Sequence, residues 1–404
     1  MSKAVFMNLS IDQLFDPAGN MRKIFSVRIP QSEHLTRVSE DLAIFLTGPG
    51  DYAIQYREIP SGLQKVFQDR GFQFGKVIPM IANPFDQKLW IDEVHQKTIG
   101  LNLSHWQVAG MSQLEKEIVV KNNSIITVEQ FAELNKKTWL PELADKNGWN
   151  FPISEIAKTG DLTSKLSQWF AKKLPFVLKP SWSSGGGGNL YLERTDDSIY
   201  RHLVSRLEQI QPGFEWIIQE KIDRTQDWSI TASTENDVIN VYTVFYDKSG
   251  LSYRHQKVSQ PIVIEAYNKI SSAIGLKLKD LGYNGVFGFD SFSGANGEHF
   301  PVTDLNVRWT KTHLIEAAIE KLKLHTDVES YRFRFQQTNA IDFETGFRQL
   351  SNLISSDAER LFIPYQASGM HNDLPGQTEI SFFTNSNLLW QSEVLAKIQK
   401  IWGA

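Results

Sequence analysis

The sequence contains no cysteine among its 404 residues. This absence excludes disulfide bonds, thiolate catalysis and zinc sites with cysteine ligands. The nine histidines include no HExxH pair, the helical pattern that binds catalytic zinc. Enzymes whose chemistry depends on a thiol or on either kind of zinc site are therefore ruled out.

Long apolar runs and a strongly basic balance are also missing. No run of 18 apolar residues occurs, so no membrane span is expected. Residues 1–15 are interrupted by Asn8, Asp12 and Gln13 and lack the apolar centre of a signal peptide. The net charge is −4, without the strongly basic face of a nucleic-acid-binding protein. We therefore expect a cytoplasmic protein that has neither nucleic acid nor a membrane as partner.

The composition is that of a globular protein with several lobes. Hydrophobic residues make up 41% and charged residues 22%, and the length exceeds the usual size of one domain. Residues 42–47 and 52–56 read as two strands joined by a turn, and residues 77–81 as an edge strand because Pro79 cannot donate a hydrogen bond. Strands mixed with helical stretches predict an α/β lobe over residues 1–125.

Periodicity and turn residues predict further elements after residue 126. The helical stretch 128–144 should restart at Pro141 and end before Gly148. A second helix, 161–172, should have Asp161 as its N-cap. Other helices are expected at 263–278 and 314–324, strands at 176–179, 189–192 and 216–222, and hairpins at 228–232 with 238–245 and at 285–292 with 299–306. Beyond residue 326 the pattern weakens, and only a terminal helix near 393–401 is predicted.

The first motif with chemical meaning is a lysine followed by a glycine-rich loop. Strand 176–179 ends at Lys179, and the loop contains Ser184, Gly185, Gly186 and Gly187. Glycines let backbone N–H groups approach a phosphate, and the lysine adds a point charge for the same anion. The lysine precedes the glycines, so this is not the GxxxxGK[ST] P-loop. The alternative is a mobile hairpin tip with a solvated lysine.

The second motif is the hairpin over residues 285–306. Alternation places Asp304 and Asn306 on one face, together with Val302 and Phe300, and a hairpin centred on residue 297 sets Asp290 opposite Asp304. The two Cβ atoms would lie ~5 Å apart. Opposed carboxylates repel unless a cation lies between them, and these oxygens suit Mg²⁺ or Mn²⁺. The alternative is a solvated polar face, which the otherwise apolar strands disfavour.

A short basic stretch and a charged strand end are less specific. Alternation places His255 and Lys257 on one face and Arg254 on the other. One face could meet a triphosphate or an acyl phosphate, or the stretch could be a solvated loop. Strand 216–222 ends in Glu220, Lys221 and Ile222. Taken alone, it reads as a core strand that runs out to solvent.

Together these segments resemble the ATP-grasp superfamily, specifically its carboxylate–amine ligases, over about residues 126–325. Asn135-Lys136-Lys137 resembles the start of the family's lysine helix, and Lys179 with Gly185–Gly188 resembles its strand lysine and flap. Glu220-Lys221-Ile222 resembles the hinge that holds adenine through its backbone. Asp290, followed by Asp304-Leu305-Asn306-Val307-Arg308, resembles the metal hairpin, although the family more often has Glu where Asp304 stands.

The resemblance implies a mixed α/β (α+β) protein with the ATP-grasp fold, in which two lobes built on antiparallel sheets clamp ATP. It implies a pre-ATP-grasp α/β domain over 1–125, the two clamp lobes over 126–220 and 221–330, and an extension of unknown role over 331–404. ATP would be held by Lys136, Lys179, Ser184, Gly185, Gly186, Gly187, Glu220, Lys221 and Ile222. Mg²⁺ (or Mn²⁺) would be held by Asp290, Asp304 and Asn306, with Arg308 and Arg254 as catalytic residues.

The reaction that the resemblance implies turns a carboxylate into an acyl phosphate, which an amine then attacks. The partners would be a small-molecule carboxylate and amine, and a homodimer is compatible with the resemblance. Alternatives are an ATP-grasp kinase, a carboxylate–thiol ligase and a non-catalytic nucleotide-binding scaffold. A scaffold would lack the metal ligands, which are present here. A surface sugar-binding module is suggested only by the 11 tryptophans, several of which lie in apolar stretches.

Overall fold

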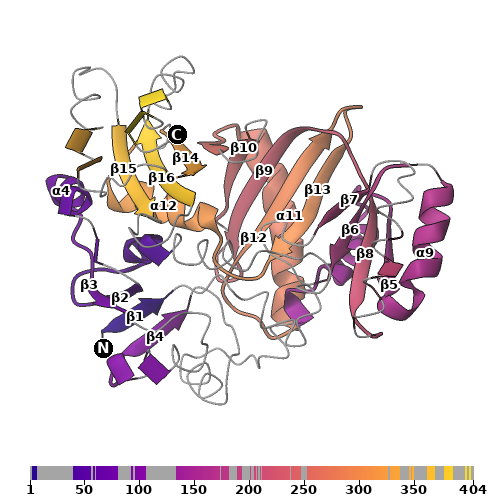
Figure 1. The fold of residues 1–404 in the computed structure, drawn as a ribbon, viewed down its shortest axis with the longest axis horizontal. Coiled ribbons are helices and arrows are strands. Elements are labelled where there is room, and N and C mark those ends of the chain that lie inside the picture. Colours follow the sequence, from indigo (N-terminus) through magenta and orange to yellow (C-terminus); the bar gives the residue numbers. More distant parts are fainter. Residues whose placement is uncertain are drawn as a thin grey trace.

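The described residues of the computed structural model form three β-sheets (Figure 1). It describes residues 2–6, 40–55, 58–59, 61–80, 92–93, 96–105, 133–172, 174–181, 189–192, 201, 204–205, 207, 210, 212–236, 238–246, 253–325, 328–336, 345–346, 348–349, 362–368, 377–384, 396–397 and 400–401. A large sheet occupies the centre, a small sheet lies at one end, and a parallel sheet lies near the N-terminus (Figure 1).

The N-terminal sheet is parallel and has the strand order β3-β2-β1-β4. Its strands are β1 (Lys3–Phe6), β2 (Tyr52–Gln55), β3 (Lys76–Pro79) and β4 (Asn102–His105), accompanied by helix α4 (Ser61–Asp69). Strand β3 lies at the edge, as Pro79 predicts. The strand predicted at residues 42–47 is wrong, because Glu40–Leu46 forms the 3₁₀ helix η1. Its consecutive buried apolar residues fit a buried helix as well as a strand, and periodicity cannot separate the two.

The small sheet is antiparallel and has the order β5-β8-β6-β7. Its strands are β5 (Ser154–Lys158), β6 (Phe176–Pro180), β7 (Leu190–Leu192) and β8 (Glu215–Glu220). Helix α9 (Thr159–Ala171) lies beside this sheet (Figure 1). Its Leu162 and Leu166 belong to the buried cluster that the strands of the sheet also line. The N-cap is Lys158 rather than Asp161, which lies in the first turn, where a carboxylate stabilises the helix dipole.

The segment that leads into the small sheet contains η2 (Lys137–Trp139) and α8 (Leu140–Asn147). The predicted restart at Pro141 and the end at Gly148 are confirmed: Pro141 lies in the first turn of α8, and Gly148 adopts a left-handed φ of 66°. Glycine reaches that conformation without a Cβ clash, which ends the helix sharply.

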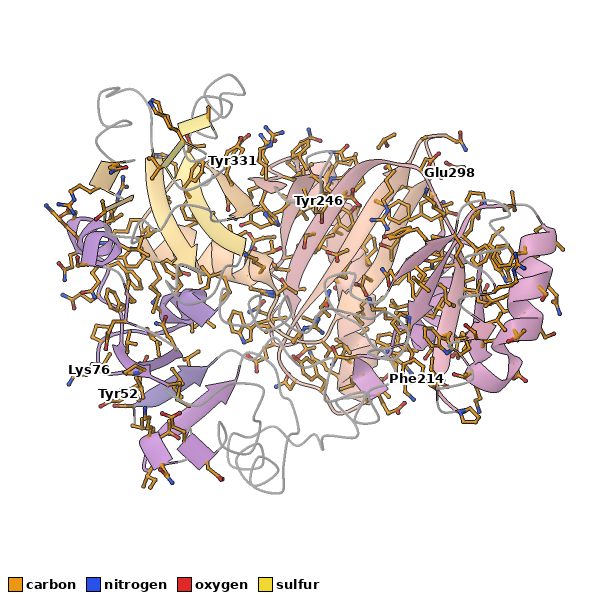
Figure 2. All side chains as sticks on the ribbon, in the orientation of Figure 1. Tyr52, Lys76, Phe214, Tyr246, Glu298 and Tyr331 are labelled. Atoms are coloured by element: carbon orange, nitrogen blue, oxygen red, sulfur yellow. The ribbon has the colours of Figure 1, made fainter. Side chains whose placement is uncertain are left out.

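The large sheet is antiparallel and has the order β13-β12-β9-β10-β11-β14-β16-β15. Its strands are β9 (Arg224–Ser233), β10 (Asn240–Tyr246), β11 (Tyr253–Lys257), β12 (Val286–Gly294), β13 (His299–Asn306), β14 (Glu329–Gln336), β15 (Phe362–Ser368) and β16 (Gln377–Thr384). Both predicted hairpins, β9 with β10 and β12 with β13, are confirmed. The sheet continues across residue 330 into the C-terminal strands, so Tyr246 and Tyr331 lie on the same sheet (Figure 2).

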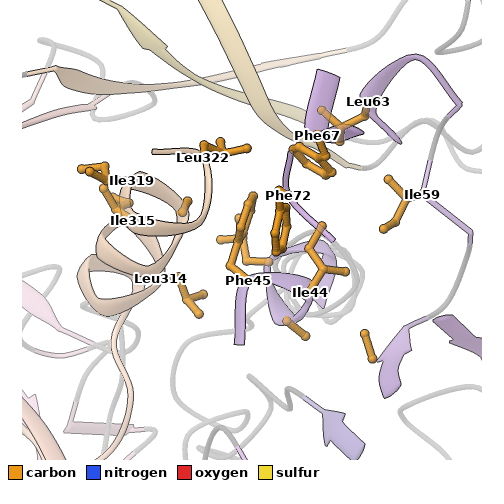
Figure 3. Close-up of a cluster of buried hydrophobic side chains, with 14 of the residues drawn as sticks. Ile44, Phe45, Ile59, Leu63, Phe67, Phe72, Leu314, Ile315, Ile319 and Leu322 are labelled. Carbon is orange, nitrogen blue, oxygen red and sulfur yellow. The ribbon is translucent and has the colours of Figure 1, made fainter. Parts of the chain in front are cut away.

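Two helices cover opposite faces of the large sheet. Helix α11 (Pro261–Asp280) packs with Ile230, Phe287 and Phe289 in one buried cluster. Helix α12 (Lys311–Lys321) bonds to Ser229 and Thr231, whose positions alternate with that of Ile230. The other side of α12 packs against the N-terminal lobe, with its leucines and isoleucines next to aromatic rings of η1 and α4 (Figure 3). In the part of the chain described, no helix combines the length and apolar character needed to cross a membrane.

Candidate functional site

The hairpin β12–β13 brings two carboxylates together. Asp290 pairs directly with Asp304, so the predicted register is confirmed. The register shifts between Asp290 and Phe292, as at a β-bulge, which re-aims side chains. Because of this shift, Val302 packs with Leu305 in the cluster under α11. The prediction that Val302 shares the face of Asp304 is therefore wrong.

Lys137 lies directly against this hairpin. Its Nζ is 3.0 Å from Oδ1 and 3.0 Å from Oδ2 of Asp304. The preceding Asn135 fixes this arrangement, because its Oδ1 accepts hydrogen bonds from Arg308 Nη1 at 3.0 Å and from the N–H of Val307 at 3.2 Å. The segment predicted to carry the first lysine is thus docked on the segment predicted to bind the metal.

Lys136, the residue chosen from the sequence for the first lysine, points elsewhere. Its Nζ is 2.7 Å from Glu133 Oε1 and 3.4 Å from Glu215 Oε2. Of the two adjacent lysines, the structure places Lys137 rather than Lys136 beside Asp304.

Lys179 approaches the same place from the small sheet. Burial, reinforced by repulsion from Lys137 and Arg224, lowers the pKa of Lys179 to about 7, against an opposing attraction to Asp304. Its Nζ donates a hydrogen bond to Gln219 Oε1 at 2.5 Å, so a neutral oxygen rather than a carboxylate holds the ammonium. A desolvated lysine of this kind favours a bound anion, which would restore its charge.

On the carboxylate side of the site, the pKa of Asp290 is shifted in the opposite direction to that of Lys179. Burial and the neighbouring Asp304 raise the pKa of Asp290 to about 7, while a hydrogen bond from Ser229 lowers it. Two facing carboxylates that resist ionising together fit a divalent cation. With Asn306, two strand positions beyond Asp304, they offer only oxygen ligands. Among the described residues there is no group of three or more His, Cys, Asp or Glu side chains placed to hold a metal, so further ligands would be amide, water or phosphate oxygens.

The predicted hinge connects the two antiparallel sheets. Strand β8 ends at Glu220, and β9 of the large sheet begins four residues later. The N–H of Glu220 donates to Ile153 O at 2.8 Å, and that of Lys221 donates to Pro175 O at 3.0 Å. Ile222 lies against Gly294 at the end of β12, where an added Cβ would be 3.1 Å from Ile222 Cγ2. The predicted phosphate loop, Ser184, Gly185, Gly186 and Gly187, lies outside the described residues.

The two predicted catalytic arginines lie in different places. Arg308 is buried beside the first lysine segment through its bond to Asn135. Arg254 lies on the opposite face of the large sheet from Asp290, because the register places Lys257 on the face of Asp290. Arg254 Nη1 is 3.6 Å from the buried Glu329, and its guanidinium stacks 3.9 Å above the Phe245 ring. These contacts place Arg254 against Glu329 and Phe245, on the face of the sheet opposite Asp290.

Sequence reasoning missed several residues that line the site. Ser229 pairs with Asp290 across β9 and β12, and Gln219 holds Lys179. Arg224 contributes positive charge near Lys179. The sequence does predict the strand 216–222 that carries Gln219. It does not indicate that this strand pairs with β6, which brings Gln219 to Lys179.

The chain is similar to known ligases in sequence and in fold. It is 24% identical over 344 residues to the butirosin acyl-carrier protein–L-glutamate ligase of Niallia circulans. The aligned region covers 81% of this chain and 78% of that protein. N5-carboxyaminoimidazole synthetase from Staphylococcus aureus, in complex with ADP, superposes with a TM-score of 0.54 at 12% identity, covering 98% of this chain and 97% of that one. L-amino acid ligase from Bacillus licheniformis gives a TM-score of 0.53 at 11% identity over 98% and 97%. No protein-family profile matches the sequence.

Proposed function

We propose that this chain, which has the ATP-grasp fold, is an ATP-dependent ligase that joins a carboxylate to an amine. The resemblance to ATP-grasp proteins and the predicted fold class are confirmed, because the whole chain superposes on solved structures with that fold. The sequence similarity to a protein named as a ligase of L-glutamate to an acyl-carrier protein supports the activation of a carboxylate for ligation.

The observation that carries the proposal is the charge arrangement where the small and large sheets meet. Asp290 and Asp304 face each other on one side, and Lys137 and Lys179 approach from the other. Such a set neutralises a triphosphate with its metal ion, which is the main demand of phosphoryl transfer.

Each residue then has a role in that chemistry. Lys179 and Lys137 would contact phosphate oxygens, and Ser184 and the loop glycines would supply backbone N–H donors to the same phosphates. Asp290, Asp304 and Asn306 would hold Mg²⁺, which neutralises charge on the phosphates. Residues 220–222, which link the sheets, would hold the adenine.

The reaction proceeds in two displacements. An oxygen of the substrate carboxylate attacks the γ-phosphorus, and the bond to the leaving ADP oxygen breaks, giving an acyl phosphate. The lone pair of the amine then attacks the acyl carbon. The C–O bond to phosphate breaks, phosphate leaves with the electron pair, and the amine releases its proton to phosphate or water. Arg308, fixed by Asn135, would stabilise negative charge in this step.

Trapping the acyl phosphate tests the proposal. Purified protein is incubated with ATP, Mg²⁺, hydroxylamine and each of the common L-amino acids, beginning with L-glutamate because the named relative acts on it. The expected result is ADP together with an amino-acid hydroxamate. A kinase would form ADP without hydroxamate, and a scaffold would form neither. A carboxylate–thiol ligase would also give hydroxamate, but it would prefer a thiol such as pantetheine to amines as acceptor.

A further inference from the structure

A row of polar side chains runs from the candidate metal hairpin across the face of the large sheet. Asp304 pairs with Asp290, Asp290 with Ser229, Ser229 with Tyr242, and Tyr242 with Lys257. Directly paired residues of antiparallel strands point to the same face. The five side chains therefore share one face and follow one line across β13, β12, β9, β10 and β11.

Lys257 ends this row and has a distinct electrostatic setting. It is half-buried, and within the described part of the chain its ammonium forms no ion pair. A carboxylate, Glu316 of α12, lies near enough to interact electrostatically with Lys257. Glu316 is already bonded, since Thr231 Oγ1 donates to it at 2.6 Å. Lys257 is thus held on the site face with its charge available to a ligand.

Glu316 also restricts what that ligand can be. Tyr242 bonds to Glu316, and burial together with this carboxylate raises the pKa of the Tyr242 phenol, so the phenol stays a neutral donor. Burial raises the pKa of Glu316 to about 7, so near neutral pH this carboxylate is only partly ionised and compensates Lys257 only in part. A ligand with a single negative charge, such as one carboxylate, then matches the one ammonium.

The position of Lys257 fits the far end of a substrate. Three strand spacings separate β12 from β11, which is about 14 Å between Asp290 and Lys257 along the sheet. The flexible four-carbon stem of lysine can lean back over part of that distance. The group that it meets therefore belongs to the substrate beyond its reacting carboxylate.

We propose that Lys257 binds the side-chain carboxylate of an acidic amino acid whose α-carboxylate is the reacting group, and so selects a dicarboxylic donor. This inference rests on the proposed ligase function and specifies its carboxylate substrate.

The test compares L-glutamate with its neutral analogue L-glutamine in the hydroxamate assay. The wild type should use L-glutamate with a kcat/KM at least about ten-fold higher, the range that one charge-assisted contact supplies. Lys257→Met should raise the KM for L-glutamate by about ten- to hundred-fold and leave the kinetics with L-glutamine unchanged. Lys257→Arg, which keeps the charge, should retain most of the preference.

Two controls make the result decisive. Lys269→Met changes an exposed lysine of α11 that pairs with Glu265, and it should have no effect. Titration of Mg–ATP into each variant reports whether the nucleotide site is intact, and Lys257→Gln is used if Lys257→Met does not bind.

The outcomes separate the two proposals. Hydroxamate formation with an unchanged glutamate-to-glutamine ratio in the Lys257 variants, or an equal loss with both amino acids, would overturn the role of Lys257 and leave the ligase function standing. A wild type that prefers neutral amino acids would do the same. No hydroxamate with any amino acid would overturn both.

Discussion

Replacing Lys137 by methionine tests which of two adjacent lysines belongs to the site. In the nucleotide-free protein the Lys137 ammonium compensates Asp304, and through it the facing Asp290. The Lys137 side chain is 8% exposed and that of Asp304 24%. Lys136, in contrast, pairs most closely with Glu133, which is 65% exposed.

These exposures set the expected magnitudes. Removing one partner of a buried ion pair costs roughly 3–5 kcal/mol, because the other charge stays behind unpaired. Because Asp304 retains some contact with water, we expect Lys137→Met to lower the free energy of unfolding by about 2–3 kcal/mol. That is about a 30- to 150-fold change in the ratio of folded to unfolded protein. An exposed pair such as that of Lys136 contributes ~1 kcal/mol or less.

Urea unfolding followed by tryptophan fluorescence, in EDTA and without nucleotide, measures both variants. Lys137→Met should unfold at a clearly lower urea concentration than Lys136→Met. Adding Mg²⁺ with ADP should recover part of the loss, since a bound cation would compensate the same carboxylates. Equal midpoints for the two variants would refute the placement of Lys137 as the cation that serves Asp304.

Three further predictions follow from the same geometry. Burial raises the pKa of Asp290 from 3.8 to about 7, so the folded state keeps a proton that the unfolded state releases, and stability should fall as pH rises from about 4 to 7. Thermal melts of Asp290→Asn should lack this fall, and an unaltered pH profile would contradict the assignment. Burial lowers the pKa of Lys179 from 10.5 to about 7, so phosphate binding must protonate it and ATP affinity should weaken above pH 7. In calorimetric titrations at pH 7, Lys179→Met should bind ATP about ten- to hundred-fold more weakly and lose that pH dependence; wild-type affinity would exclude a phosphate contact. At Gly288 an added Cβ would lie 2.6 Å from Thr310 Cγ2, so Gly288→Ala should destabilise the protein by about 1–3 kcal/mol. Gly213→Ala, at a position with open space around it, is the control and should not destabilise the protein. Equal melting temperatures for the two variants would show that α12 can move aside.

The hairpin and its register were predictable because all the information is local. A glycine-containing turn at residues 294–297 and period-two alternation on either side fix which residues of β12 and β13 oppose each other. The pairing of Asp290 with Asp304 follows from these two features alone. The bulge near Phe292 left no comparable signal, so the direction of Val302 was missed.

Features that depend on distant contacts were not predictable. Whether Lys136 or Lys137 faces the site is decided by the docking of Asn135 on Val307 and Arg308, which are more than 170 positions away in the chain. The strand β14 pairs with β11 and β16, although nothing in its own sequence selects those partners. The fold class could still be predicted, because it depends on which motifs occur and in what order.

Helix α12 connects the candidate site to the N-terminal lobe. On the side toward the sheet, Thr312 Oγ1 lies 3.0 Å from Ser229 Oγ, and Ser229 is the cross-strand neighbour of Asp290. On the other side, Leu314 and Ile315 pack in the same buried cluster as Phe45 of η1 (Figure 3). Packed interiors leave little room for one layer to move without displacing the next. The position of Ser229, and with it the environment of the Asp290 carboxylate, therefore depends on packing within a lobe that contributes no residue to the candidate metal site.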